Sequence, residues 1–484
     1  MSESFYWYDL ETTGTNPKWD RIIQFAGVRT DTELNIIDNP KSFYVRLSDD
    51  VLPNPAASLV TNISPNTLQN EGVFEKAGLD AIFEELSVPG TCTVGYNNLR
   101  FDDEFLRYGF FRNFVEPYAR EWKNGNSRFD VFELVRAAGA LRREGINWPL
   151  NDDGTASYRL EAITQLNNID HGNAHDALSD VFATIGLARL IRREQPRLFD
   201  YYLSLRDKRR VKRLLEPFGQ TSIVFVSALN PREKFNVAPV LAVGLNPLNS
   251  NSVIAVDLGL DIDPLLEATS EEIRHNLLTA SKEDRYPIRD IRLNKCPFVA
   301  TKEVVTEKIN RYLKIDWEEV ENRRLKLQGE WFSETLLSAF SVHPATREED
   351  PDASLYDGFL NNQDIAKMKP LNEAIKENRW LDIHFTESRL NSLASRLKAR
   401  SFPHCMSESE QRNWGNFVKK KLTSDGPWLS IDKYFEKIGE VSKNALDSPN
   451  TSDHLILNDL IKYGRELASR YQINTDNAES WLRR

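Results

Sequence analysis

The chain has 484 residues, of which 40% are hydrophobic, and it carries a formal net charge of −10 at pH 7. This length is enough for about two to four domains with cores of their own. The acidic balance argues against a protein that coats nucleic acid nonspecifically. No apolar run approaches the roughly 18–20 residues of a membrane-spanning helix, which excludes an integral helical membrane protein.

The start of the chain has no basic stretch followed by an apolar one, so we expect no secretory signal. The three cysteines, Cys92, Cys296 and Cys405, are far apart and include no C-x-x-C pair. Isolated cysteines of this kind are typical of free thiols in a reducing compartment, and we therefore expect a cytoplasmic protein.

Residues 1–195 alternate between strand and helix patterns, which predicts a mixed α/β domain. The clearest helix begins near Ala174, with Asn173 as a candidate N-cap and Pro196 just beyond its end. The other predicted elements are strands at 5–10, 22–30, 41–47 and 91–97, and helices at 75–86, 101–114 and 131–143.

The pattern changes after about residue 200. Short β-rich runs separated by Asn-Pro turns occupy 221–260, and helices are predicted from 301 to 341. The acidic, Pro-containing stretch 343–359 is the predicted linker, and the rest of the chain is mainly helical. We therefore predict three domains, with bounds at 1–195, 196–346 and 347–484.

Three separate segments of the α/β domain carry acids beside apolar elements. Asp9 and Glu11 are two residues apart in an aromatic strand, so their side chains leave the same face. Asp102 follows a strand at the start of a helix. His175 and Asp180 are five residues apart, about 140° on an ideal helix, so His175 is expected at the helix entrance and Asp180 in the second turn.

Four carboxylates that converge on one point repel one another, and some would take up protons. Divalent cations such as Mg²⁺ resolve the repulsion because they prefer oxygen ligands. Two such ions about 3.5–4 Å apart clamp the attacking and leaving oxygens of a phosphoryl displacement. A nearby histidine is then suited to take the proton of the attacking water.

Three segments resemble the exonuclease motifs of the DEDD superfamily, histidine subclass: YDLETTG, NNLRFDDEFL and AHDALSD. Further segments resemble the bacterial exodeoxyribonuclease I family: GYNNLRFDDE, EGINWPLNDDG, YRLEAIT, QPRLFDYY and NKCP, with NNQDIAKM and KARSFP as weaker likenesses. The resemblance implies an α/β fold with a ribonuclease-H-like exonuclease core, an SH3-like β-rich second domain and a helical C-terminal domain. The three would form a C-shaped clamp around single-stranded DNA.

The resemblance also implies an activity, the Mg²⁺-dependent 3′→5′ hydrolysis of single-stranded DNA to 5′-mononucleotides in DNA repair and recombination. Two Mg²⁺ ions are implied, with Mn²⁺ able to substitute. Asp9 matches the acid that bridges both ions, Glu11 and Asp180 match acids of the first ion's shell, and Asp102 matches the acid that supports the second ion. His175 matches the general base.

The sequence offers two neighbouring residues, Asp103 and His171, as alternatives to Asp102 and His175. The spacing F-D-x-x-F-L selects Asp102 over Asp103, which we interpret as a helix N-terminal acid favoured by the helix dipole. We expect His171 to lie in a loop, without the role of His175.

Substrate contacts are predicted beside the motifs. Arg159 matches a position near the scissile phosphate, where a guanidinium grips phosphate bidentately; an exposed helix arginine is the alternative. The other candidates for binding DNA are Glu11, Thr12, Asn98 and Arg100, with Gly14 allowing close approach of the terminal nucleotide. Trp380 and Trp414 are either base-stacking residues or helix core.

The densest basic run, 206–213, is either a solvated helix, a phosphate track or a dock for an acidic tail. The resemblance favours the dock for part of this run, because the family binds the acidic, Phe-ended C-terminus of single-stranded DNA-binding protein. Arg142 and Tyr201 match positions in that pocket. We expect a monomer.

Two other functions remain open on these motifs. An RNA-trimming or proofreading exonuclease would share the chemistry but not usually the second and third domains. An inactive DNA-binding scaffold would be expected to lack a motif acid, whereas all four are present.

Overall fold

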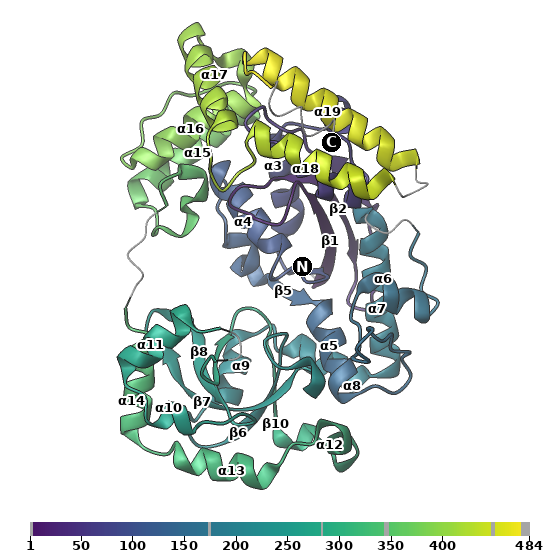
Figure 1. The fold of residues 1–484 in the computed structure, drawn as a ribbon, viewed down its shortest axis with the longest axis vertical. Coiled ribbons are helices and arrows are strands. Elements are labelled where there is room, and N and C mark those ends of the chain that lie inside the picture. The colour runs from purple at the N-terminus through teal and green to yellow at the C-terminus, as the bar shows by residue number, and fades with distance from the viewer. Residues whose placement is uncertain (1–2, 173–175, 282–283, 343–347, 447–450, 476–484) are drawn as a thin grey trace.

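The computed structural model describes residues 3–172, 176–281, 284–342, 348–446 and 451–475. Figure 1 shows three parts: an α/β part in the middle, a β-rich part below it and a helical part above it. Among the described residues, no helix is both long and apolar enough to cross a bilayer.

The α/β part is built on a mixed sheet of five strands in the order β3-β2-β1-β4-β5. The strands are β1 (Ser4–Thr12), β2 (Ile22–Thr30), β3 (Lys41–Tyr44), β4 (Thr91–Gly95) and β5 (Ser127–Asp130). Strand β1 is antiparallel to β2 and parallel to β4. The predicted strands are therefore confirmed, with shorter ends at 41–47 and 91–97.

Helices cover both faces of this sheet, which explains the aromatic sequence of β1. Phe5 and Trp7 lie in one apolar cluster with residues of α5 and α7, whereas Tyr6 and Tyr8 lie in another with residues of α3 and α4. The helices of this part are α1 (Pro55–Thr61), α2 (Pro65–Glu71), α3 (Glu75–Leu86), α4 (Asp102–Arg112), α5 (Val131–Leu141), α6 (Leu160–Leu166), α7 (Ala177–Glu194) and α8 (Pro196–Ser204), with short 3-10 helices at Ala119–Glu121 and Lys123–Gly125. The next helix, α9 (Lys208–Leu215), lies in the β-rich part (Figure 1), where it packs on β10 (Phe298–Thr301).

The start of the clearest helix differs from the prediction, whereas its end agrees. The described helix α7 begins at Ala177 and is capped by Asp176, whose side chain accepts a hydrogen bond from the amide of Ser179. Asn173, the predicted cap, lies outside the described residues, as does Ala174. Pro196 does end α7, but it also starts α8 at once, because proline is well suited to the first turn of a helix.

The β-rich part contains an antiparallel sheet in the order β10-β6-β7-β8-β9. Its strands are β6 (Ser222–Val226), β7 (Val237–Asn246), β8 (Asn249–Asp257), β9 (Ile288–Arg292) and β10 (Phe298–Thr301). Its helices are α10 (Asp263–Leu266), α11 (Ser270–Thr279), α12 (Glu307–Leu313), α13 (Trp317–Lys326) and α14 (Glu330–Ala339), with 3-10 helices at Arg232–Lys234 and Lys302–Val304.

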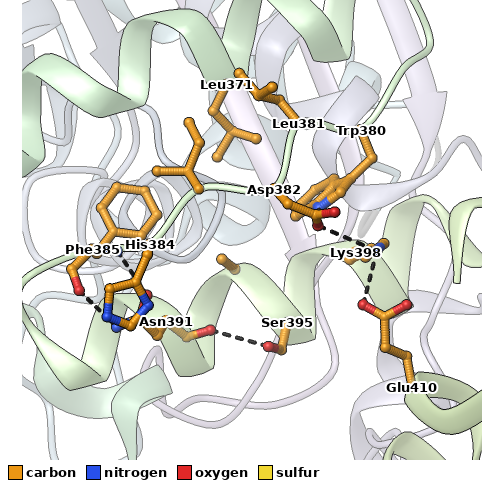
Figure 2. Close-up of a pocket in the computed structure, with 12 residues that line it drawn as sticks. Leu371, Trp380, Leu381, Asp382, His384, Phe385, Asn391, Ser395, Lys398 and Glu410 are labelled. Atoms are coloured by element: carbon orange, nitrogen blue, oxygen red, sulfur yellow. Dashed lines mark hydrogen bonds and ion pairs between the residues drawn. The ribbon is translucent and has the colours of Figure 1, made fainter. Parts of the chain in front are cut away.

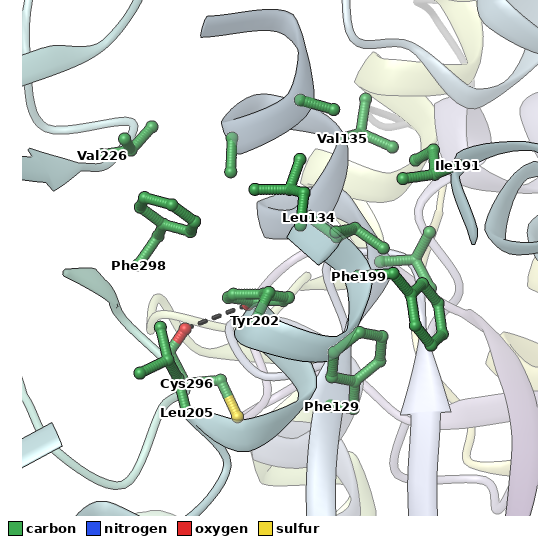
Figure 3. Packing of buried hydrophobic residues seen from close by; sticks show 14 of the residues in the cluster. Phe129, Leu134, Val135, Ile191, Phe199, Tyr202, Leu205, Val226, Cys296 and Phe298 are labelled. Atoms are coloured by element: carbon green, nitrogen blue, oxygen red, sulfur yellow. Dashed lines mark hydrogen bonds between the residues drawn. The ribbon is translucent and has the colours of Figure 1, made fainter. Parts of the chain in front are cut away.

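One apolar core runs from the α/β part into the β-rich part. Figure 3 shows Phe129 of β5 and Phe199 of α8 on one side, Tyr202 in the middle and Phe298 of β10 beyond it. The hydroxyl of Tyr202 donates to the carbonyl of Cys296 at 3.0 Å. Burial of this shared surface fixes the two parts relative to each other.

The helical part contains α15 (Asn362–Lys376), α16 (Ser388–Ser401), α17 (Glu408–Thr423), α18 (Ile431–Leu446) and α19 (Thr451–Arg470), with a 3-10 helix at Pro403–Cys405. Buried charges join it to the α/β part. Arg400 of α16 binds Asp50, with Nη2 2.7 Å from Oδ2, and binds Asp352, with Nη2 2.6 Å from Oδ2. Arg21 binds the same Asp352 at 3.1 Å.

The interpretation of 343–359 as a linker is wrong for part of that stretch. Residues 343–347 lie outside the described residues, but η5 (Pro351–Tyr356) is a packed 3-10 helix. Asp352 within it is fully buried. Two of its acids, Asp350 and Asp352, instead serve as counter-ions of largely buried arginines.

Candidate active site

The two acids of β1 lie where one face of the strand opens. Asp9 and Glu11 continue the face of Phe5 and Trp7, and both are partly exposed although Leu10 between them is buried. The strand is irregular after Glu11, where its pairing with β2 shifts by one residue. The predicted common orientation of Asp9 and Glu11 is therefore confirmed.

Helix α7 brings the third acid to this point. It packs along β1. Asp180 lies in its first turn and not in the predicted second turn, because the described helix begins at Ala177, later than expected. One ligand oxygen each of Asp9, Glu11 and Asp180 lies within 4.8 Å of the others. Three acids that are separated by up to 171 residues in the chain thus form a group of a size that a divalent cation bridges.

Asp102 approaches the same edge of the sheet from α4. Because β4 runs parallel to β1, the carboxyl ends of both strands point the same way, and α4 begins shortly after β4. Asp102 is 3% exposed, yet its Oδ1 has no hydrogen-bond partner, and neither amide atom of the buried Asn98 has one. A buried carboxylate oxygen without a hydrogen-bond partner in the protein fits a residue that binds a cation or a water.

The pKa values of these acids are raised because the acids are buried close to one another. Burial, followed by the charges of Asp102 and Glu11, raises the pKa of Asp9 well above its usual range. Burial and the charge of Asp180 raise the pKa of Glu11 to about 8. Burial also raises the pKa of Asp102 to about 8. A cation at this point would relieve the repulsion and favour the ionised acids.

Asp103, the residue after Asp102, belongs to a separate, buried ionic network. It lies in the first turn of α4, as predicted, but it is fully buried. Arg120 contacts its Oδ1 at 2.5 Å, Arg128 contacts its Oδ2 at 2.7 Å, and the hydroxyl of Tyr8 donates to Oδ1 at 2.8 Å. Burial alone would raise the pKa of Asp103, but the guanidinium groups hold it below its usual range.

Only one of the two histidines that precede Asp180 in the sequence, His171, lies within the described residues. His175, the predicted general base, lies outside the described residues, so its role stays a prediction. His171 lies in a loop, as expected, but it is not remote from the acids. Its Nε2 is 2.5 Å from Oδ1 of Asp180.

The predicted DNA-binding residues differ in their burial and in their contacts. The hydroxyl of Thr12 donates to the carbonyl of Gly14 at 2.7 Å, which fixes the turn after β1. Arg100 is partly exposed and lies 3.6 Å from Glu133. Arg159 is exposed at the residue before α6. These positions leave the contacts of Arg100 and Arg159 with DNA as predictions.

The residues predicted to bind a partner lie at the junction with the β-rich part. The guanidinium of Arg142 donates to the carbonyl of Val304 at 3.2 Å, and the hydroxyl of Tyr201 donates to the carbonyl of Val299 at 2.8 Å. Arg210 of α9 lies over the ring of Tyr201, 5.8 Å from its centroid. The basic run is only partly solvated, because α9 buries Val211 and Leu215 between its charged residues.

The helical part holds a pocket of about 380 Å³ that is separate from the acids. Figure 2 shows Trp380 beside Lys398, which lies between Asp382 and Glu410. Trp380 also packs on Phe402 with ring centroids 5.9 Å apart. Trp414 stacks on Phe417 within the helices, so the alternative of helix core is favoured for Trp414.

The fold and the acids define the class of this protein: an exonuclease with a ribonuclease-H-like core and an acidic site for divalent metal. Family models match three successive regions, namely exonuclease at 6–188, exonuclease I SH3-like domain at 206–341 and exonuclease I C-terminal domain at 349–467. The chain belongs to the exodeoxyribonuclease I family. The predicted bounds at 195/196 and 346/347 fall between these regions and stay a prediction.

Individual relatives support this assignment along nearly the whole chain. Exodeoxyribonuclease I of Escherichia coli is 40% identical over 432 residues, which cover 88% of this chain and 91% of that protein. The crystal structure of E. coli exonuclease I in complex with a dA16 oligonucleotide matches with a TM-score of 0.90 at 37% identity, covering 96% of this chain and 100% of that one. An ExoI/SSB-Ct complex matches with a TM-score of 0.89 at 36% identity, with the same coverage.

Proposed function

We propose that this protein removes 5′-mononucleotides from the 3′ end of single-stranded DNA with Mg²⁺, in DNA repair and recombination. The observation that carries the proposal is the group formed by Asp9, Glu11 and Asp180 at the end of β1, within an exonuclease fold. A relative of the same three-part architecture binds a dA16 oligonucleotide. We also place the protein in the bacterial cytoplasm, where such DNA arises.

Four acids would hold two cations in this proposal. Asp9 would contact both, Glu11 and Asp180 would complete the first site, and Asp102 would support the second. The orphaned Oδ1 of Asp102 and the raised pKa values of Asp9 and Glu11 support this set. Bound divalent cations neutralise the charge that develops on a phosphate during its displacement.

The protein's own side chains would then orient the DNA and take a proton from the attacking water. His175 would accept the proton of the attacking water, as a base whose ordinary pKa is about 6.5. Arg159 and Arg100 would hold the phosphates of the last nucleotides, while Thr12, Asn98 and Glu11 would contact the terminal nucleotide. The ion pairs of Asp103 with Arg120 and Arg128, and its hydrogen bond with Tyr8, would keep Asp102 in place, because the two acids are consecutive in α4.

A partner follows from the same family membership. A relative forms a complex with the C-terminal segment of single-stranded DNA-binding protein, and we propose that this chain binds the same acidic tail. Arg142, Tyr201 and the exposed cations of α9 are the proposed contacts. Their position at the edge of β10 gives the tail a surface separate from the acids.

End-labelled oligonucleotides test the proposal directly. We expect Mg²⁺-dependent release of mononucleotides from the 3′ end of single-stranded DNA, little from double-stranded DNA or matched RNA, and none with EDTA. Asp9→Asn should abolish the release, whereas Asp38→Asn, at an exposed acid, should retain it. Preferential degradation of RNA, or release that persists in EDTA, would overturn the proposal.

A further inference from the structure

We propose that His171 is a positioning residue for the metal site: its imidazole holds Asp180 in the orientation that binds a cation. The inference rests on the proposed metal role of Asp180. His171 lies between α6 and α7, and its side chain is only 7% exposed. A histidine in this loop therefore belongs to the wall of the site and not to the surface.

The imidazole bridges two structural elements. Its Nε2 lies 2.5 Å from Oδ1 of Asp180 on α7, and its Nδ1 lies 3.0 Å from Oγ1 of Thr164 on α6. Thr164 is fully buried. The ring thus connects an acid of the site to a fixed point in the helix that packs beside it.

The hydroxyl of Thr164 determines which way these hydrogen bonds run. Its single proton is given to the main chain of α6, since Oγ1 lies 2.7 Å from the carbonyl of Leu160 and 3.0 Å from that of Glu161. A hydroxyl whose proton is used can only accept from a third neighbour. Nδ1 of His171 is therefore the donor to Thr164, and the short contact on the other side of the ring requires a proton between Nε2 and Asp180.

This arrangement orients Asp180 without using up its capacity to bind a cation. A carboxylate has about four lone-pair sites on two oxygens, so one oxygen can accept from His171 while the group still faces Asp9 and Glu11. Residues that hydrogen-bond a metal ligand typically contribute about 10–100-fold to metal affinity. An ordinary buried histidine would face a main-chain carbonyl or solvent, whereas Nε2 of His171 faces an acid of the metal group.

Two amide substitutions separate the two hydrogen bonds. The side-chain amide of His171→Asn reaches the position of Nδ1 and keeps the contact with Thr164, but it is too short for Asp180. The amide of His171→Gln reaches the position of Nε2 and keeps a donor for Asp180. Both variants place a neutral polar group in the same cavity, which makes them a matched pair.

The measurement is the affinity of the full chain for Mn²⁺ without DNA. The electron paramagnetic resonance signal of free Mn²⁺ reports how much of the ion is bound. We expect His171→Asn to weaken Mn²⁺ binding about tenfold or more and His171→Gln to recover most of it, with equal melting temperatures. A wild-type chain that binds no Mn²⁺ would refute the proposed function itself. Wild-type binding with unchanged or tighter binding by His171→Asn would overturn only the role of His171.

A second variant covers the case in which His171→Asn fails to fold. Thr164→Val keeps the imidazole and the size of the buried side chain but removes the acceptor for Nδ1. The folded variant should bind Mn²⁺ more weakly than the wild type. Unchanged Mn²⁺ affinity would show that the anchored ring does not orient Asp180 and would overturn the proposal.

Discussion

Replacing Asp352 by asparagine should loosen the contact between the helical part and the α/β part. The side chain of Asp352 is fully buried and accepts hydrogen bonds from Arg400 at 2.6 and 3.1 Å and from Arg21 at 3.1 Å. Arg396 lies 3.2 Å away. The substitution keeps the shape of the side chain but removes the negative charge that these three arginines share.

The expected cost follows from the burial of the arginines. Removing one partner of a buried ion pair costs about 3–5 kcal/mol, because a charge is left uncompensated. Arg400 keeps Asp50, with Nη2 2.7 Å from Oδ2, so we expect the lower end of that range. At about 1.36 kcal/mol for each factor of ten, 3 kcal/mol shifts the local opening equilibrium by more than about 100-fold.

Hydrogen exchange measured by mass spectrometry resolves this local effect in a chain of several parts. Peptides of η5 and α16 should exchange about 100-fold faster in Asp352→Asn, in proportion to the shift in the opening equilibrium, while peptides of β1 and β4 should not change. Asp382→Asn is the matched control, because Asp382 is 88% exposed and its pair with Lys398 is 3.5 Å long. If the two variants exchange alike, the buried charges do not hold the interface.

Three further predictions concern other contacts. Despite burial, Arg400 holds the pKa of both Asp50 and Asp352 well below the usual range. The stabilisation from these two acids is therefore fully present above about pH 3.9, the pKa of an unfolded Asp, and is lost only as the pH falls through the lower folded pKa. Local opening of α16, measured by hydrogen exchange, that already increases at pH 5–6 would contradict this. Tyr8→Phe removes the 2.8 Å hydrogen bond to Asp103 and should cost about 1.5–3 kcal/mol in thermal unfolding, whereas an unchanged melting temperature would argue against it. His175→Ala should lower turnover much more than DNA affinity, and an equal loss of both would exclude a general base.

The geometry at the end of β1 was predictable because it depends on local periodicity. A strand places residues i and i+2 on one face, so Asp9 and Glu11 had to emerge together. The start of α4 at Asp102 followed from a strand-to-helix junction in the sequence, and the place of Asp180 near the start of α7 followed from the helical pattern after it. The role of each acid in binding metal remains a prediction.

Features that depend on distant partners were not predictable in the same way. The stretch around Asp352 has the composition of a solvated linker, but its counter-ion Arg21 lies 331 residues away in the chain. His171 was expected to be a plain loop residue because nothing in its neighbourhood reveals the contact with Thr164 or Asp180. Asp103 was expected at a helix terminus, and only the fold shows that Arg120 and Arg128 enclose it.

The double-sided packing of β1 has a consequence for how this segment tolerates mutation. Many single replacements would leave its alternation intact, but deletion or insertion of one residue ahead of Asp9 would rotate every later side chain to the opposite face. The acids would then turn into the apolar layer of α3 and α4, and an apolar neighbour would take the partly exposed position of Asp9. Changes of length should therefore be absent from this strand in functional variants, while the loop between β2 and β3 should accept them.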